Sequence, residues 1–292
     1  MDQSDERVRY SIVVPAYNEA DYLDISLTSL QQQDFDGSYE IIVVDNNSSD
    51  DTAAVATSFG VRVISEPQRG VCSARQRGAE AATGDVIVSV DADTRYPASW
   101  LRTIDERFAA APEIVAVAGP CRYENPSWWA KRFPTLLFGF VAGAFAMTGF
   151  VVYVSATNIA MRRSAFPGYD KRLTQGGDEL DLLRRLRQRG KVVWDRHNIV
   201  ATSARRMQRG LLYNLFVSGL VYYVLGYLLN RAFAYRAIGM APAFRKTVKI
   251  NDTRPHRRLA LAMLLLAAGV TSLSLVYGPE AFAELNHLWH SP

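Results

Sequence analysis

The chain has 292 residues, 49% hydrophobic and 21% charged, so a large core is possible and global disorder is excluded. Two cysteines, Cys72 and Cys121, are too few for a disulfide framework or a zinc site, and we expect them to be buried. The net charge is +4, and basic residues crowd positions 184–258, which favours anionic lipid or phosphate partners over nucleic acid. Because Met1–Tyr10 is charged and lacks the apolar part of a secretory signal, we expect the folded part to stay in the cytosol.

The first half of the chain alternates short apolar runs with helical patterns. Strands are predicted at 11–15, 40–45, 61–65 and 85–90, and helices at 19–33, 50–59 and 71–82. Continuous Val/Ile runs separated by helices are typical of a parallel sheet with helices on both faces, so the predicted fold class is α/β. In such sheets ligands bind beyond the carboxyl ends of the strands, and the residues that follow each strand are therefore the first candidates for a site.

Three longer apolar stretches follow, at 133–154, 211–229 and 259–277. The last one has no charged residue, and its helical length of about 28 Å matches the hydrocarbon core of a bilayer. If 211–229 also crossed the membrane, the basic segment 231–258 would be translocated, which is unfavourable. We therefore predict one transmembrane helix at 259–277 with its amino end in the cytosol. The two earlier stretches are predicted to be interfacial helices, with buried core helices as the alternative.

The run Val88-Ser-Val-Asp91-Ala-Asp93-Thr94 ends a predicted strand with two carboxylates two positions apart. In extended backbone this spacing places both side chains on one side of the chain. Neighbouring carboxylates repel unless a cation lies between them, and Mg²⁺ or Mn²⁺ prefers oxygen ligands that it shares with substrate phosphates. The alternative is that Asp93 caps the helix beginning near Pro97 and that Asp91 is a solvated strand end.

Further candidates follow two other strands. Asp45 ends the second predicted strand and could accept a hydrogen bond from a nucleobase or a ribose hydroxyl. In Pro15-Ala-Tyr-Asn-Glu19, Tyr17 could pack on a nucleobase, whereas Glu19 could be only a first-turn acid favoured by the helix dipole.

Taken in order, these segments resemble the family 2 glycosyltransferases, which have the GT-A fold, a Rossmann-like, mostly parallel sheet. The resemblance covers roughly residues 10–205. The matching segments are Ser11-Ile-Val-Val-Pro-Ala-Tyr-Asn-Glu19, Val43-Val-Asp45, Arg69-Gly70 with Ala74-Arg75 and Gly78, Asp91-Ala-Asp93, Ala156-Thr-Asn158-Ile-Ala-Met-Arg-Arg163 and Gly177-Asp-Glu-Leu-Asp-Leu182.

The resemblance implies roles for single residues. Asp91 and Asp93 match the pair that binds Mg²⁺ or Mn²⁺, and Asp91 is also a substrate-binding candidate. Asp178-Glu179 matches an acidic pair whose second member is the usual catalytic base, so Glu179 is favoured and Asp178 is the alternative. Donor-binding positions are implied for Pro15, Tyr17, Glu19, Asp45, Arg69 and Arg75.

Arg205 and Arg206 precede the middle apolar stretch and could bind the donor diphosphate or an acceptor phosphate. The alternative is an interfacial anchor that snorkels to the membrane surface. The family's histidine ligand is not evident, since Ser203 stands near its expected place. The Gln-x-x-Arg-Trp motif of processive synthases is absent as well, so one sugar per acceptor is expected.

The sequence thus predicts a metal-dependent, inverting glycosyltransferase with a UDP- or GDP-sugar donor and a membrane lipid acceptor, a polyprenyl phosphate first, at the cytoplasmic face of the cell membrane. The predicted domains are a GT-A catalytic domain at 1–205, an interfacial helical region at 206–258, a transmembrane helix at 259–277 and a tail at 278–292. One alternative is a transferase for a soluble or polymeric glycan. The other is a non-catalytic scaffold that binds a nucleotide sugar.

Overall fold

The computed structural model describes residues 7–173, 178–225 and 229. All of these residues belong to one of the two units into which the chain divides, residues 1–246. The predicted transmembrane helix at 259–277 and the tail at 278–292 lie outside the described residues.

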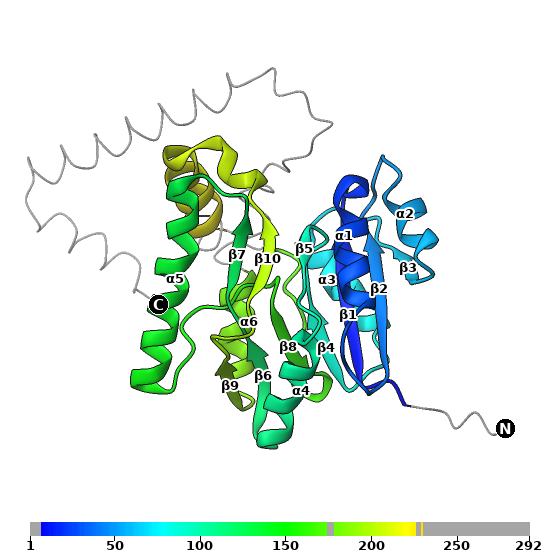
Figure 1. The fold of residues 1–292 in the computed structure, drawn as a ribbon, viewed down its shortest axis with the longest axis horizontal. Coiled ribbons are helices and arrows are strands. Elements are labelled where there is room, and N and C mark those ends of the chain that lie inside the picture. Colours follow the sequence, from blue (N-terminus) through cyan, green and yellow to red (C-terminus); the bar gives the residue numbers. More distant parts are fainter. Residues whose placement is uncertain (1–6, 174–177, 226–228, 230–292) are drawn as a thin grey trace, which may run out of the picture. The chain divides into compact units, whose positions relative to one another are not determined.

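A seven-stranded sheet forms the centre of this unit, in the order β3-β2-β1-β4-β8-β6-β9 (Figure 1). Strand β8 is antiparallel to both of its neighbours, and the other pairs are parallel. The predicted α/β class with a mostly parallel sheet is thus confirmed. The strands are β1 (Tyr10–Ala16), β2 (Tyr39–Asp45), β3 (Arg62–Ser65), β4 (Val86–Ser89), β6 (Ile114–Ala118), β8 (Ile159–Arg162) and β9 (Lys191–Trp194).

Helices cover both faces of the sheet because each strand carries apolar side chains on both sides. In β1, Ile12 and Val14 join one buried cluster and Val13 joins the other, since successive residues of a strand point to opposite faces. The first cluster contains residues of α1 (Ala20–Gln31), α2 (Thr52–Ser58) and α4 (Trp100–Ala110). The second contains residues of α3 (Val71–Ala81), α5 (Trp128–Thr148) and α6 (Asp178–Arg187).

A smaller sheet joins three segments that are far apart in the sequence. It consists of β5 (Thr94–Arg95), β10 (Val200–Ser203) and β7 (Cys121–Glu124), with β10 in the middle. Strand β10 leads into the 3₁₀-helix η2 (Arg205–Arg209) and the wider, π-type helix η3 (Tyr213–Leu225). The other 3₁₀-helix among the described residues is η1 (Arg163–Ala165). Because the Ser203 N–H donates to the Asp93 carbonyl oxygen (3.1 Å), this sheet places η2 beside the Asp91–Asp93 turn.

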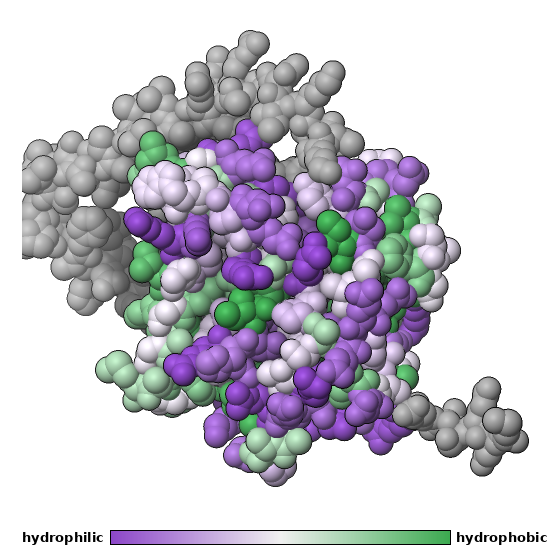
Figure 2. All heavy atoms as spheres, viewed as in Figure 1, coloured by the Kyte–Doolittle hydropathy of each residue, from purple (hydrophilic) through white to green (hydrophobic). Residues whose placement is uncertain are grey.

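The two earlier apolar stretches form α5 and η3. Each helix buries one side, with Phe138 and Val141 of α5 and Val217 of η3 among the buried residues. Except for Ile25 and Ile199, every exposed large hydrophobic side chain among the described residues belongs to 128–152 or 211–229. Figure 2 shows hydrophobic residues along the edge of the molecule where α5 lies. In the described part of the chain, no helix is both long enough and apolar enough to cross a membrane.

A substitution at Gly78 tests how closely α3 packs on the sheet. A Cβ at this position would lie 2.2 Å from Val13 Cγ1 and 3.0 Å from Val44 Cγ2. Gly78→Ala should therefore lower the free energy of unfolding by about 1–3 kcal/mol, because a packed core does not accept an added methyl group. Chemical denaturation measures the change.

Gly139→Ala in α5 is the matched control, because apart from its chain neighbours and the backbone of its own helix no described atom lies within 4 Å of the added Cβ. It should be neutral or stabilising by up to about 1 kcal/mol, since alanine favours the helix. The same loss of stability in both variants would contradict the tight contact of α3.

Candidate active site

One cavity of about 960 Å³ gathers most of the predicted site residues beyond the carboxyl ends of β1 and β4. Helices α5, η2 and η3 supply much of the remaining wall. Asp45 and Asp178 are outside the lining. The predicted residues that line it are Pro15, Tyr17, Glu19, Arg69, Arg75, Asp91, Asp93, Glu179, Arg205 and Arg206.

Hydrogen bonds with buried side chains fix the position of the Asp91–Asp93 turn. The hydroxyl of Tyr96 accepts a hydrogen bond from the Asp91 N–H (3.0 Å) and donates to the Thr157 carbonyl oxygen (3.2 Å). Trp100, packed against the Tyr96 ring, donates to Asn158 Oδ1 (2.9 Å). The alternative that Asp93 caps a helix is wrong, because α4 begins at Trp100 after Ser99 and Asp93 faces the cavity instead.

Arg205 forms ion pairs with two of the cavity's acids. Its Nη1 and Nη2 lie 2.7 and 2.6 Å from the two carboxylate oxygens of Glu19, and Nη2 also lies 2.9 Å from Asp93 Oδ2. Burial lowers the pKa of the guanidinium, but the hydrogen bonds with Glu19 and the charge of Asp93 raise it more, so the net shift is upward. Glu19 is therefore more than a first-turn acid, because it joins the start of α1 to η2.

Arg75 also pairs with two acids and is more deeply buried than Arg205. We call each arrangement, one guanidinium between two carboxylates, an arginine fork. Arg75 Nη1 lies 2.6 Å from Asp178 Oδ2, and its Nη2 lies 2.9 Å from Asp91 Oδ1. The side chains of Arg75 and Asp178 are only 6% and 1% exposed. Asp178 is thus held in an ion pair away from the cavity, whereas its neighbour Glu179 faces it. This difference favours Glu179 over Asp178 as the acid that can meet a ligand in the cavity.

Glu179 lies in the first turn of α6, and both of its carboxylate oxygens accept hydrogen bonds. The Ala156 N–H donates to Oε1 (3.2 Å), and the hydroxyl of Tyr223 donates to Oε2. Burial raises the pKa of Glu179 to about 7, helped by the charge of Asp178 and opposed by the bond from Tyr223 and by Arg75. A carboxyl group with a pKa near 7 can take up a proton at neutral pH.

Asn46, which the sequence analysis did not single out, shapes the loop that carries Arg69. Its buried amide donates to the carbonyl oxygens of Glu66 and Gln68 (2.8 Å each) and accepts from the Gly70 N–H (2.8 Å). Gly70 has a φ of 141°, which side-chain-bearing residues rarely adopt. Asn46 directly follows β2, so the strand-end rule that selected Asp45 could also have selected it.

Tyr17 and Arg69 form a stacked pair at the cavity wall. Arg69 Cζ lies 3.4 Å from the centroid of the Tyr17 ring, so the guanidinium covers one face of the aromatic ring. Asp45 bonds a neighbour in the chain instead: its Oδ1 accepts a hydrogen bond from the Ser48 N–H (3.1 Å) in the turn after β2. The structure thus brings Tyr17 and Arg69 together at the cavity and leaves Asp45 beside it.

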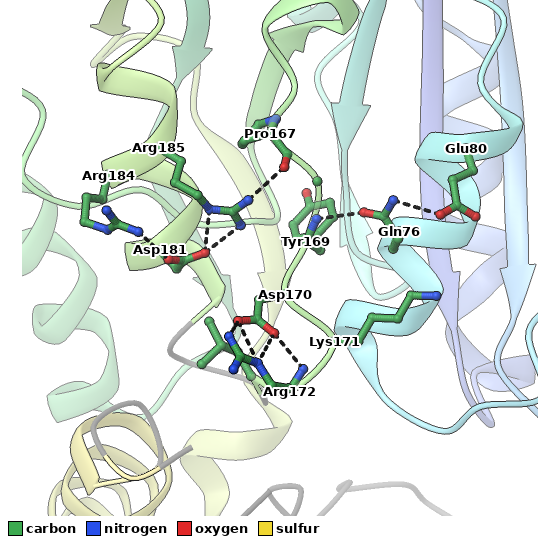
Figure 3. Close-up of a pocket in the computed structure, with 12 residues that line it drawn as sticks. Gln76, Glu80, Pro167, Tyr169, Asp170, Lys171, Arg172, Asp181, Arg184 and Arg185 are labelled. Carbon is green, nitrogen blue, oxygen red and sulfur yellow. Dashed lines mark hydrogen bonds and ion pairs between the residues drawn. The ribbon is translucent and has the colours of Figure 1, made fainter. Parts of the chain in front are cut away.

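A second pocket of about 610 Å³ lies between α3, α6 and the segment 167–173 (Figure 3). Arg184 and Arg185 both pair with Asp181, and the Tyr169 N–H donates to Gln76 Oε1 (2.7 Å). None of the predicted site residues lines this pocket. Its contacts hold the segment 167–173 between α3 and α6, the helix that carries Glu179 in its first turn.

The chemistry of the Asp91–Asp93 pair fits a hard divalent cation. Both carboxylates line the cavity, and Asp91 Oδ2 has no hydrogen-bond or ion-pair partner within the described ranges. No group of three His, Cys, Asp or Glu residues in those ranges could hold a metal alone. The remaining ligands would therefore be phosphate oxygens and water, the usual supplement for Mg²⁺.

The family model described as glycosyl transferase family 2 matches residues 11–169, more than half of the chain. The chain belongs to this family. An undecaprenyl-phosphate 4-deoxy-4-formamido-L-arabinose transferase of Sodalis glossinidius is 34% identical over 133 residues, which are 42% of this chain and 40% of that protein. A glucosyl-dolichyl phosphate glucuronosyltransferase of Haloferax volcanii is 29% identical over 189 residues, 59% of each. The chain thus spans only 40–59% of the length of these two curated relatives.

Solved structures of glycosyltransferases share the fold. A mannosyltransferase from Pyrobaculum calidifontis in complex with GDP-Man and Mn²⁺ has a TM-score of 0.55 at 20% identity, covering 68% of this chain and 57% of that chain. Glucosyl-3-phosphoglycerate synthase from Mycobacterium tuberculosis with Mn²⁺ and UDP-glucose has a TM-score of 0.54 at 22% identity, covering 77% and 79%. The expected GT-A-like architecture of a glycosyltransferase is therefore confirmed.

The buried pair of Arg75 and Asp178 should be important for stability. Arg75→Met should lower the free energy of unfolding by about 3–5 kcal/mol, because Asp178 would remain buried without its partner. Adding Asp178→Asn should recover much of the loss, since the uncompensated charge is removed. Chemical denaturation of the single and double variants measures both effects.

Arg102→Met is the control, because its ion pair with Asp34 is exposed at 51% and 59%. Such a pair contributes about 0–1 kcal/mol. If Arg75→Met lowered stability no more than Arg102→Met, the structural role of the buried fork would be refuted.

Proposed function

We propose that this chain is an inverting glycosyltransferase that moves one sugar from a UDP- or GDP-sugar to a lipid phosphate at the cytoplasmic face of the membrane. The observation that carries the proposal is that one cavity has both an ionic and an apolar wall. Four acids and four arginines line it together with apolar side chains of α5 and the segment from η2 to η3, among them Trp129, Phe133, Leu137, Met207, Leu211 and Leu220. A sugar diphosphate suits the first wall, and the chain of a lipid acceptor suits the second.

The ionic wall suits a nucleoside diphosphate. Asp91 and Asp93 would hold Mg²⁺ or Mn²⁺, which when bound neutralises the diphosphate and improves it as a leaving group. Tyr17 and Arg69 offer a planar surface for the nucleobase. The complexes of two structural neighbours with Mn²⁺ and GDP-Man or UDP-glucose support this donor class.

Glu179 would act as the general base. The acceptor oxygen attacks the anomeric carbon while the bond from that carbon to the diphosphate oxygen breaks, and the electron pair leaves with the diphosphate. The acceptor proton passes to a carboxylate oxygen of Glu179, and the configuration inverts. An acceptor phosphate that is already ionised needs no base, and Glu179 then orients it.

Several observations support a lipid phosphate as the acceptor. Arg205 is engaged by Glu19 and Asp93, whereas the guanidinium of Arg206 lines the cavity without an ion pair to any described acid. Arg206 is thus the better candidate for an acceptor phosphate. Exposed apolar side chains on α5 and η3, such as Phe140 and Phe216, suit contact with a bilayer. The names of two relatives include undecaprenyl phosphate and dolichyl phosphate.

Donor binding and transfer should depend on different acids. With Mn²⁺, one of UDP-glucose, UDP-N-acetylglucosamine or GDP-mannose should raise the melting temperature of the full chain in detergent. Asp93→Asn should abolish this shift. Glu179→Gln should keep it but slow transfer by roughly two to four orders of magnitude. Equal loss of donor binding in both variants would contradict the separate roles.

The acceptor class is tested with undecaprenyl phosphate in detergent micelles, to which a labelled sugar should be transferred. Arg206→Gln should raise KM for this lipid about tenfold or more while the donor-induced melting shift stays unchanged, because a charge-assisted contact to phosphate is lost. Transfer to a soluble glycan but not to the lipid would refute the lipid assignment. A protein that neither binds nor cleaves any donor would favour the scaffold alternative.

A further inference from the structure

The apolar helix η3 reaches the catalytic end of α6 through a tyrosine. Tyr223, near the end of η3, donates its hydroxyl proton to Glu179 Oε2, a residue 44 positions earlier in the chain. Its hydroxyl oxygen also lies 2.9 Å from that of Tyr153. Because the proton of Tyr223 is directed at Glu179, Tyr153 is the donor of this second bond. All three side chains line the cavity.

We propose that Tyr223 is a positioning residue that holds the carboxylate of Glu179 toward the acceptor, and that Tyr153 holds Tyr223 in turn. The inference rests on the proposed role of Glu179 as the base, and it adds η3 to the groups that prepare that base. With Oε1 fixed by the Ala156 N–H and Oε2 by Tyr223, the carboxylate cannot rotate freely. A side chain fixed by such supporting bonds keeps the geometry that proton transfer needs.

The bond from Tyr223 also favours the ionised form of Glu179, because a hydroxyl donates more strongly to a carboxylate than to a neutral acid. It acts against burial and the charge of Asp178, and in the same direction as Arg75. Among the described residues, further titratable groups that interact with Glu179 are Cys121 and Tyr123 of the small sheet and Tyr153. Losing the Tyr223 hydroxyl should therefore move the titration of Glu179 upward.

The test is an infrared titration of the full chain in detergent between pH 5 and 9, which needs no substrate. The carbonyl stretch of protonated Glu179 is the band that Glu179→Gln removes. Tyr223→Phe should raise the midpoint of this band by about one pH unit. Tyr153→Phe should raise it by less, because Tyr223 keeps its bond to Glu179 but loses its own support.

Tyr222→Phe is the matched control, since Tyr222 is on the same helix, does not line the cavity and makes no hydrogen bond among the described residues. In this variant the titration midpoint of the Glu179 band should equal that of the unaltered protein. Unchanged midpoints in Tyr223→Phe and Tyr153→Phe would overturn the inference, and so would an equal shift in Tyr222→Phe, which would indicate general loosening of η3.

Transfer to undecaprenyl phosphate separates this inference from the proposed function. Tyr223→Phe should lower kcat about tenfold at pH 6.5 and much less at pH 8.5, with donor KM unchanged. Full activity of Glu179→Gln toward this lipid would refute both roles proposed for Glu179, as the base and as the group that orients an ionised phosphate. A strong loss in Glu179→Gln, with no midpoint shift in Tyr223→Phe, would refute only the positioning role.

Discussion

Two arginine forks make it possible for several carboxylates to lie around one cavity. Arg75 joins Asp91 to Asp178, and Arg205 joins Asp93 to Glu19. Without these cations, acids at such close range would repel one another or take up protons. Each fork also ties distant segments together, so the charge balance of the site and the assembly of the fold depend on the same contacts. The forks occupy Asp91 Oδ1 and Asp93 Oδ2, so a divalent cation at this turn would use the other carboxylate oxygens or take the place of an arginine.

The two sides of the cavity differ in how they are built. On the ionic side, the hydroxyl of Tyr96 bonds both the Asp91 N–H and the Thr157 carbonyl oxygen, which leaves the Asp91–Asp93 turn after β4 little freedom. On the apolar side, α5 and η3 each bury one face and expose another. A rigid charged wall and an amphipathic wall suit a reaction between a polar donor and an acceptor from a bilayer.

Local patterns were sufficient for four strands of the sheet and for ten of the residues that line the cavity. They did not predict β6, β8 and β9, nor the pairings between distant segments. The strand predicted at 11–15 is β1, and the one at 40–45 is β2, because Val/Ile runs ending in polar residues are local signals. The separation of Asp178 from Glu179 depends on Arg75, 103 residues before Asp178, and no spacing rule reports such a contact. The contact of Tyr223 with Glu179 could not be predicted either, because a tyrosine in an apolar stretch is equally typical of an aromatic residue at a membrane interface.

The position of η3 affects where the protein can be shortened. The family model ends at residue 169 and the predicted catalytic domain at 205, yet Tyr223 lies beyond both. A recombinant fragment cut at 205 would retain the strand-end acids and Glu179 but would lose one wall of the cavity and the hydroxyl donor to that acid. Such a fragment could still bind a nucleotide while giving a misleadingly slow rate, so soluble versions of this enzyme should extend through Leu225 at least.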